Sequence, residues 1–370
     1  MDRGRRTAGV RAKPTMELEK ELRERTGGGD RLAGEDNFAN LSMCFTDGSK
    51  RTTRMAQLRI AVAGIGLIGR RHIELIQAHP ACEVAAIIDP ASHAAEVAGR
   101  VGARLYRTIE DMFHSEHPDG VILATPNAFH LDGAISCIQA GVPILIEKPL
   151  TDTLEAGERL CEAAELADAR ILVGHHRRYN PILLRARQIV EQGTLGRIVA
   201  IQGSALFYKP DAYFDEAPWR RQPGGGPILI NLIHEIDSLR FVCGEIASVQ
   251  ALTSNATRRF PVEDTAAINL RFAGGALGTF LLSDTAASCK SWEQTSRENG
   301  AYPAYDDDDC YLIAGTEGSL GLPTMRLKTY ARREDRSWWK PFQATVVEIE
   351  HASPLERQLD HFCAVIRDEA

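Results

Sequence analysis

The chain has 370 residues, which predicts two or three domains at about 100–200 residues per domain. Hydrophobic residues make up 44% and charged residues 25%, a composition that excludes global disorder. The formal net charge is −7, which argues against non-specific nucleic-acid binding because such binding needs a basic surface. No apolar run approaches the roughly 20 residues that cross a bilayer, and the eight cysteines form no C-x-x-C pair. We therefore expect a cytoplasmic protein with reduced thiols and no membrane partner.

Residues 1–55 differ from the rest of the chain. They contain three consecutive glycines at 27–29, many charged residues and few apolar ones. Such a segment cannot bury enough apolar surface to offset the entropy of ordering it. We predict a disordered N-terminal extension.

From residue 56 to residue 178, short apolar runs alternate with amphipathic stretches of helical period. The strand-like runs are Arg59–Ala63, Val84–Ile88, Gly120–Ala124, Pro143–Ile146 and Arg170–Val173. The helical stretches are Leu67–Ala78, Ser92–Val101, Thr108–His114, Ala128–Ala140 and Leu154–Ala167. Strands that are apolar throughout and separated by helices predict an α/β domain with a doubly wound parallel sheet covered on both faces.

From residue 179 to residue 370, the pattern changes to alternating segments separated by turn signals. Helices are expected at Pro181–Glu191, Ile228–Val242 and Pro354–Arg367. Strands are expected at Arg197–Phe207, Ala247–Ser254, Thr265–Phe272, Ala276–Ser283, Cys310–Ala314, Ser319–Pro323, Arg326–Tyr330 and Thr345–Ile349. We predict a second α+β domain with a large, mostly antiparallel sheet that serves substrate binding and oligomerisation.

A glycine-rich motif follows the first predicted strand. It reads Gly-Ile-Gly-Leu-Ile-Gly over residues 64–69, opens a predicted helix, and is followed by Asp89 at the end of the next strand. In this context G-x-G-x-x-G is the Rossmann dinucleotide fingerprint, in which the helix N-terminus binds the pyrophosphate. Asp89 can accept hydrogen bonds from the ribose hydroxyls and no arginine occurs in the next ten residues, so NAD is favoured over NADP. The predicted cofactor-binding residues here are Gly64, Ile65, Gly66, Leu67, Ile68, Gly69 and Asp89.

Three further segments carry a family resemblance. They are Ala124–His130 (ATPNAFH), Ile146–Leu150 (IEKPL) and the stretch from Gly224–Pro227 (GGGP) to His234–Asp237 (HEID). In this order they resemble the Gfo/Idh/MocA family of oxidoreductases over roughly residues 58–367. The resemblance implies NAD as cofactor, a carbohydrate or polyol substrate, and further cofactor contacts. Those contacts are Thr125, Pro126, Asn127, His130, Glu147 and Lys148.

Lys148 and His234 are the predicted catalytic residues. Lys148 falls just beyond the carboxyl end of a parallel strand, the edge at which open α/β sheets bind ligands. A lysine beside a nicotinamide can stabilise charge on the reacting oxygen. His234 lies on the polar face of the predicted helix 228–242, opposite an apolar stripe that includes Ile236, and histidine is the natural general base near neutral pH.

Other residues are predicted to bind substrate, alongside Lys148 and His234. They are Arg178, Trp219, Arg220, Asn231 and Asp237. Asp237 could orient Lys148 or His234, and Arg178 could instead form an interdomain ion pair. The three glycines at 224–226 could leave room for substrate, and the loop 283–309 could act as a lid. Ile230 stands where many similar proteins carry an aspartate, and no metal site is assigned.

The sequence therefore predicts an NAD-dependent dehydrogenase that acts on a secondary alcohol of a sugar, polyol or inositol-like substrate. Two alternatives are an NAD-dependent glycosidase of the same fold and a non-catalytic NAD-binding regulatory protein. A sheet with one uncovered face predicts a homodimer or homotetramer.

Overall fold

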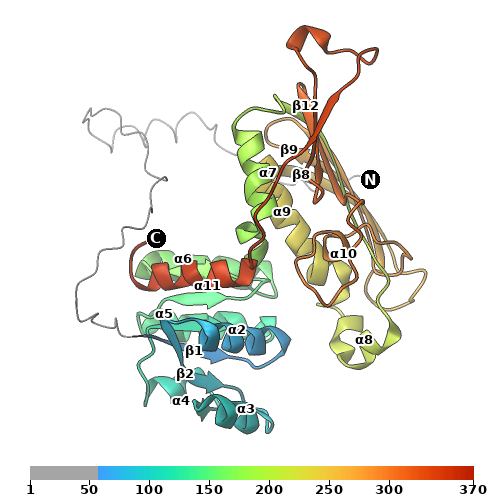
Figure 1. Ribbon diagram of the computed structural model, residues 1–370. Helices are drawn as coiled ribbons and strands as arrows, with labels where there is room; N and C mark the ends of the chain where they lie inside the picture. Colours follow the sequence, from blue (N-terminus) through green and yellow to red (C-terminus); the bar gives the residue numbers. More distant parts are fainter. Residues whose placement is uncertain (1–56) are drawn as a thin grey trace, which may run out of the picture. The chain divides into compact units, whose positions relative to one another are not determined.

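A six-stranded parallel sheet begins the structure, a computed structural model that describes residues 57–370 (Figure 1). The extension expected over residues 1–55 lies outside the described residues. The strand order is β3-β2-β1-β4-β5-β6, and every neighbouring pair is parallel. The strands are β1 (Leu58–Ala63), β2 (Cys82–Ile88), β3 (Arg104–Tyr106), β4 (Gly120–Leu123), β5 (Ile144–Ile146) and β6 (Ile171–Val173). The helices are α2 (Leu67–Ala78), α3 (Ala94–Val101), α4 (Ile109–Phe113), α5 (His130–Gln139) and α6 (Leu154–Ala167).

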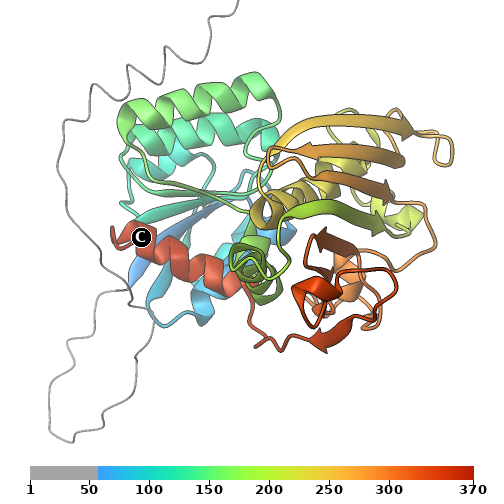
Figure 2. The same cartoon turned by 90° about the horizontal axis from the view of Figure 1, so that it is seen from above.

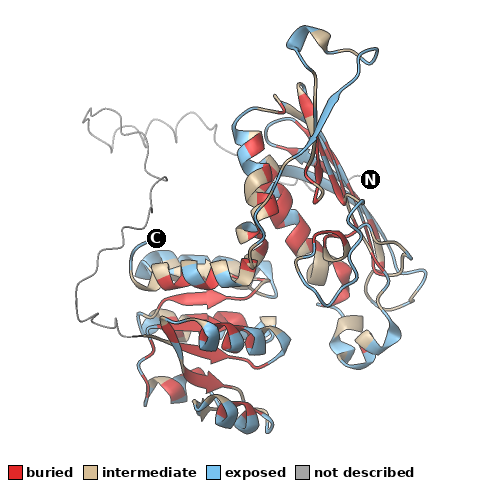
Figure 3. Cartoon of the chain, viewed as in Figure 1, coloured by how far each residue is buried: buried red, intermediate tan, exposed pale blue. Residues whose placement is uncertain are grey.

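The doubly wound parallel sheet is confirmed, and alternate side chains explain how both of its faces are covered. Ile60 and Val62 of β1 join one buried cluster, whereas Ala61 and Ala63 join another on the opposite face. Strands β4 and β5 are buried throughout, and the parallel sheet is mostly red in Figure 3. The sequence analysis missed β3, because this edge strand has only three residues and is partly exposed.

The second sheet has eight strands in the order β14-β13-β12-β11-β7-β10-β9-β8. All its pairings are antiparallel except that of β7 with β10, so the mostly antiparallel sheet is also confirmed. The strands are β7 (Ile198–Leu206), β8 (Ile246–Ser254), β9 (Thr265–Phe272), β10 (Leu277–Ser283), β11 (Tyr311–Gly315), β12 (Gly318–Leu322), β13 (Arg326–Thr329) and β14 (Gln343–Val346). The helices of this part are α7 (Pro181–Glu191), α8 (Asp211–Asp215), the π-helix η4 (Ile228–Leu232), α9 (Ile233–Cys243) and α10 (Trp292–Thr295). Short 3₁₀ turns are η1 (Asn127–Phe129), η2 (His176–Tyr179), η3 (Pro218–Arg221) and η5 (Arg333–Asp335).

Helix α9 packs differently from the simple amphipathic pattern expected over 228–242. Leu232, Leu239 and Val242 join the core of the second sheet, as an apolar stripe should. Ile236, however, is 36% exposed, whereas Glu235 is fully buried. The stripe prediction was wrong at Ile236, because a buried arginine draws Glu235 inward and turns the opposite side of the helix outward.

The last helix, α11 (Pro354–Ile366), was expected within the second domain, 179–370. Instead Leu359, Phe362 and Cys363 belong to the core of the parallel sheet. The helix lies along the parallel-sheet domain in both Figure 1 and Figure 2, and Gly120 of β4 leaves space for Phe362 and Ile366. Local periodicity shows that a helix is amphipathic but not which core receives its apolar face. Among the described residues, none of the helices is long and apolar enough to span a membrane.

Polar groups also join α11 to the amino-terminal edge of the sheet. The sulfur of Cys82 lies 3.3 Å from that of Cys363 and 3.1 Å from Nδ1 of His79. Nε2 of His79 is 3.0 Å from the carboxylate of Asp360. The hydrogen bond with the Cys363 thiol, together with burial, raises the pKa of Cys82. These contacts hold the end of the chain to the edge opposite the glycine-rich loop.

Replacing Phe362 with alanine should lower the free energy of unfolding by about 3–5 kcal/mol, because its fully buried ring would leave a cavity between α11 and β4. Thermal or urea denaturation measures this. Leu166→Ala, at a side chain that is 90% exposed on α6, is the control and should change stability by less than about 0.5 kcal/mol. Equal effects of the two substitutions would show that α11 does not support the parallel-sheet core.

Candidate active site

The glycine-rich loop joins β1 to α2 and has the conformation that a dinucleotide needs. Gly64 has φ +89°, and a Cβ atom there would lie 2.4 Å from the carbonyl oxygen of Ala124. A Cβ atom on Gly69 would lie 1.9 Å from the carbonyl oxygen of Gly64. Gly66, by contrast, has nothing within 4 Å of its Cβ position. No protein atom covers Gly66, and no side chain caps the first turn of α2, so backbone N–H groups there are available to bind a pyrophosphate. The residues present therefore fit NAD.

Asp89 follows β2 at the carboxyl edge of the sheet. Its carboxylate accepts hydrogen bonds from the backbone N–H of Ile65 at 3.0 Å and from that of Ala91 at 2.8 Å. The carboxylate is thereby fixed beside the glycine-rich loop. Because each oxygen can accept a further hydrogen bond, this position suits the ribose hydroxyls of a bound dinucleotide.

His130 was expected to contact the cofactor, but its ring serves the packing of two loops. The side chain is fully buried. Nε2 lies 2.9 Å from the carbonyl oxygen of Thr125, and Nδ1 lies 3.0 Å from that of Pro149. The histidine therefore ties the loop after β4, which holds Thr125, Pro126 and Asn127, to the loop after β5. This expectation was wrong because both ring nitrogens are engaged by the backbone.

Glu147 was also expected to contact the cofactor, and it too faces inward. One carboxylate oxygen lies 2.8 Å from Nε2 of His72 on α2, and the other accepts the N–H of Lys148 at 3.2 Å. Burial by itself would raise the pKa of Glu147, but the hydrogen bond and the charge of His72 lower it overall. Glu147 therefore positions the backbone of Lys148 against α2. The peptide bond between Lys148 and Pro149 is cis.

Lys148, which follows β5 of the parallel sheet, contacts the segment that leads into the helix of His234. Nζ of Lys148 lies 3.4 Å from the carbonyl oxygen of Ile230, one turn before His234. Burial lowers the pKa of Lys148, and burial together with the charges of Lys148 and Arg177 holds the pKa of His234 well below its ordinary value. Nδ1 of His234 is buried without a hydrogen-bond partner among the described residues. The arrangement provides an ammonium that can stabilise an oxyanion beside a neutral imidazole that can accept a proton.

A buried charge cluster that the sequence analysis did not assign supports this pair. Arg177 donates to Glu235 at 2.6 Å and to Glu293 at 2.8 Å. Glu298 lies 3.1 Å from His176, whose ring packs edge-on against that of His234 with centroids 5.2 Å apart. Burial raises the pKa of Glu235 to about 7, although Arg177 opposes the rise. The cluster links η2, α9 and the loop expected to act as a lid.

Arg178 and Asp237 form an ion pair with each other. Nε of Arg178 lies 3.0 Å from both carboxylate oxygens of Asp237, and a terminal nitrogen lies 2.7 Å from one of them. The two residues line a pocket together with Tyr179 and His361. Lys148 and His234 are not among the residues that line this pocket. The ion-pair alternative for Arg178 therefore holds, and the expectation that Asp237 orients Lys148 or His234 was wrong, because the arginine occupies its carboxylate.

The remaining substrate candidates surround a second lysine. Asn231, in the π-helix, accepts a hydrogen bond from Nζ of Lys209 at 2.6 Å. Arg220 stacks on the ring of Tyr213 at 3.8 Å, and Trp219 is 54% exposed. The sequence analysis missed Lys209. Its position three residues after β7, in an aromatic stretch, was the available signal.

Two of the three glycines before the π-helix, Gly225 and Gly226, are explained by close packing. A Cβ atom on Gly225 would lie 2.6 Å from the carbonyl oxygen of Arg220. Gly226 has φ +80° and abuts Glu263, whose carboxylate accepts the N–H of Ile228 at 2.8 Å. Both glycines are therefore required by the chain itself, rather than by a substrate as expected.

Two family models match the chain. The model described as the oxidoreductase family with an NAD-binding Rossmann fold matches residues 58–175, and the GFO/IDH/MocA C-terminal domain matches residues 183–321. The cofactor of this Rossmann family is NAD. The two matches together cover the glycine-rich loop, Lys148 and His234.

Curated proteins and solved structures agree with these matches. The chain is 31% identical over 208 residues to the rhizopine catabolism protein MocA of Rhizobium meliloti, covering 55% of this chain and 63% of that protein. It is 35% identical over 150 residues to inositol 2-dehydrogenase of Corynebacterium glutamicum (strain R), covering 40% and 44%. The matched region thus spans less than two thirds of either relative. The WlbA dehydrogenase from Bordetella pertussis, solved with NADH and UDP-GlcNAcA, aligns with a TM-score of 0.63 and 29% identity over 71% of this chain and 77% of that one.

Replacing Gly66 with alanine should weaken NADH binding at least about tenfold without unfolding the chain, because the added methyl group meets no protein atom but enters the space left for the pyrophosphate. Fluorescence titration with NADH and circular dichroism measure the two effects. Gly69→Ala is the contrast, since its methyl group collides with Gly64 and should destabilise the fold itself. Unchanged NADH affinity in Gly66→Ala would place the dinucleotide elsewhere.

Proposed function

Because the chain belongs to the GFO/IDH/MocA family of oxidoreductases, we propose that it is an NAD-dependent dehydrogenase of a secondary alcohol on a sugar, polyol or inositol-like substrate. The observation that carries this proposal is the meeting of Lys148 with the helix segment of His234. The inositol 2-dehydrogenase and WlbA relatives support a carbohydrate substrate. The carboxylate of Asp89 supports NAD over NADP, because it would repel a 2′-phosphate.

In the proposed reaction His234 accepts the proton of the substrate hydroxyl. Its imidazole is neutral at pH 7 because its pKa lies well below the ordinary value, and its Nδ1 has no partner among the described residues. Lys148 donates a hydrogen bond to the same oxygen and stabilises the alkoxide that forms as the proton leaves. NAD, when bound, supplies the hydride acceptor at the nicotinamide. His234 is buried and Lys148 is half-buried, which limits the access of water to the oxygen on which charge develops.

Lys148→Met and His234→Asn should each lower kcat about 10²- to 10⁴-fold, because each substitution removes a proton-transfer or charge-stabilising group from the reacting oxygen. A screen of NADH absorbance over inositols, aldoses and sugar acids identifies a substrate and then measures the variants. NADH affinity serves as the folding control, and Lys328→Met, at an exposed lysine on β13, should retain wild-type kcat. Full activity of Lys148→Met would contradict the mechanism, and release of free sugar without net NADH would indicate the glycosidase alternative.

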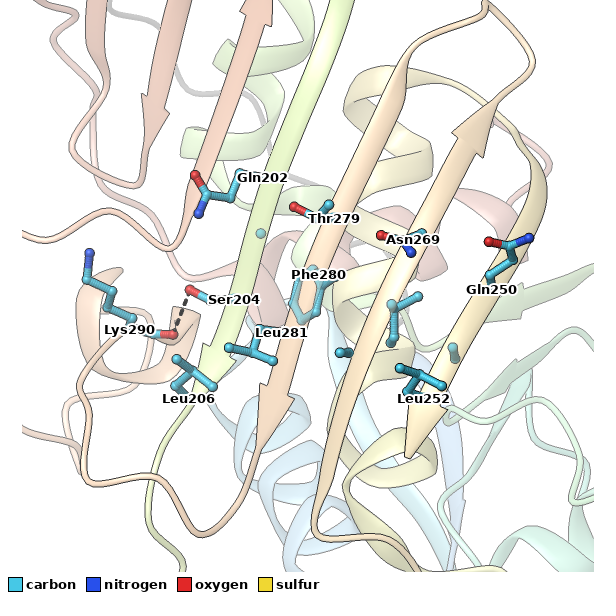
Figure 4. A pocket seen from close by; sticks show the side chains of 14 residues that line it. Gln202, Ser204, Leu206, Gln250, Leu252, Asn269, Thr279, Phe280, Leu281 and Lys290 are labelled. Atoms are coloured by element: carbon cyan, nitrogen blue, oxygen red, sulfur yellow. Dashed lines mark hydrogen bonds between the residues drawn. The ribbon is translucent and has the colours of Figure 1, made fainter. Parts of the chain in front are cut away.

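We also propose a homodimer or homotetramer assembled through the open face of the second sheet. Strands β9 and β10 alternate between buried and exposed residues, so one face packs on the core and the other is bare. A row of amide and hydroxyl side chains crosses this face from Gln250 through Asn269 and Thr279 to Gln202 (Figure 4). Beside it Leu252 and Leu281 are 79% and 43% exposed, and a second copy would cover these leucines.

Leu252→Glu combined with Leu281→Glu should dissociate the oligomer, because an interface would then have to bury two unpaired carboxylates. Sedimentation velocity at micromolar concentration measures the change. Leu166→Glu introduces a charge at an exposed leucine of α6, away from this face, and should leave the oligomer intact. A wild-type chain that sediments as a monomer would contradict the assembly.

A further inference from the structure

Lys209 holds a second ammonium group near the proposed catalytic pair. Its backbone N–H donates to the carbonyl oxygen of Asp284 at 2.9 Å, which fixes the residue three positions after the end of β7. Its Nζ donates to the side-chain oxygen of Asn231 at 2.6 Å. Lys148 contacts the carbonyl oxygen of Ile230. The two ammonium groups therefore contact consecutive residues of the π-helix, within one turn of His234.

The charge of Lys209 is not matched by an ion pair within the described residues 57–370. The carboxylate of Asp284 is 2.8 Å from Nε of Arg258, and that of Glu293 is 2.8 Å from Arg177. The partner of Nζ is a neutral amide, and the rings of Phe207 and Tyr213 lie 5.4 Å and 4.8 Å from it. A partly buried ammonium without a carboxylate partner is costly unless a ligand supplies the missing charge.

The surroundings of Lys209 favour an anion. Burial lowers its pKa to about 8, against the opposing charges of Asp284 and Glu293, so the group is still mostly protonated at pH 7. The Arg220 guanidinium stacks on Tyr213, whose ring Lys209 also faces, and adds a second positive charge. The side-chain nitrogen of Asn231 can donate to a ligand while its oxygen accepts from Lys209.

We propose that Lys209 and Asn231 bind a carboxylate of the substrate, so that the substrate class is a sugar acid or polyol acid. This inference rests on the proposed dehydrogenase function, because it takes the reacting alcohol to lie between Lys148 and His234. The nearness of Asn231 to His234 then places the carboxylate close to the alcohol carbon. One ammonium and one amide suit a singly charged, planar carboxylate, whereas a phosphate is usually bound by more donors.

The test compares matched acids and neutral sugars. D-glucuronate, D-galacturonate and D-gluconate are set against D-glucose, D-galactose and D-glucitol, with D-galactose 6-phosphate as the phosphate probe. At least one acid should exceed its neutral counterpart in kcat/KM. Lys209→Met should lower the kcat/KM of that acid, relative to the kcat/KM of its neutral counterpart, about 10- to 100-fold, as expected for loss of a hydrogen bond to a charged group. Lys328→Met removes an exposed ammonium from the same domain and should leave the ratio unchanged.

Isothermal titration calorimetry with the same probes separates this inference from the proposed function. If no probe is oxidised but the acids bind more tightly than the neutral sugars, and Lys209→Met abolishes the difference, the carboxylate site stands and the dehydrogenase proposal fails. If neutral sugars are oxidised and bound as well as acids, or Lys209→Met keeps the preference for acids, the carboxylate site is wrong and the dehydrogenase proposal survives. Preference for the phosphate probe over every acid would also overturn it.

Discussion

The contact between the Lys148 ammonium and the carbonyl oxygen of Ile230 connects the carboxyl edge of the parallel sheet with the segment that leads into α9. Lys148 lies in the loop after β5. The carboxylate of Glu147 and the ring of His130 hydrogen-bond to the backbone of this loop and fix its position. The ammonium is thereby directed at the π-helix, a local departure from regular α-helix that is frequent at functional sites. The burial that favours a neutral imidazole on His234 also lowers the pKa of the lysine beside it. Burial therefore lowers the pKa of both groups that the proposed mechanism uses.

The charge cluster around Arg177 shows how the second domain maintains that arrangement. A buried ion pair is a poor source of stability, but removing one partner leaves a buried charge uncompensated. Arg177 contacts Glu235 on α9 and Glu293 on α10, so neither element can shift without breaking a charged contact. The bidentate pair of Arg178 with Asp237 secures the same turn of α9. These contacts restrain His234 from several sides without taking its ring nitrogens.

The parts of the structure that depend on residues close together in the sequence could be predicted from the sequence. The glycine-rich loop was one such part, because the close approach of Gly64 and Gly69 is set within a few residues. The positions of Lys148 and His234 followed from a strand end and a helix face. The hydrogen-bond partners of the polar side chains could not be predicted, because they come from other elements of the fold, as with Lys209 and Asn231. For the same reason the packing of Phe362 against β4 gave no local signal.

The central claim is that Lys148 and His234 converge on one oxygen beside the redox ring of a bound nucleotide. A crystal structure of the chain with NADH measures this most directly. We expect the nicotinamide C4 to lie beside a site for the substrate oxygen that is within about 3.2 Å of both Nζ of Lys148 and a ring nitrogen of His234. A nicotinamide bound away from both side chains would contradict it.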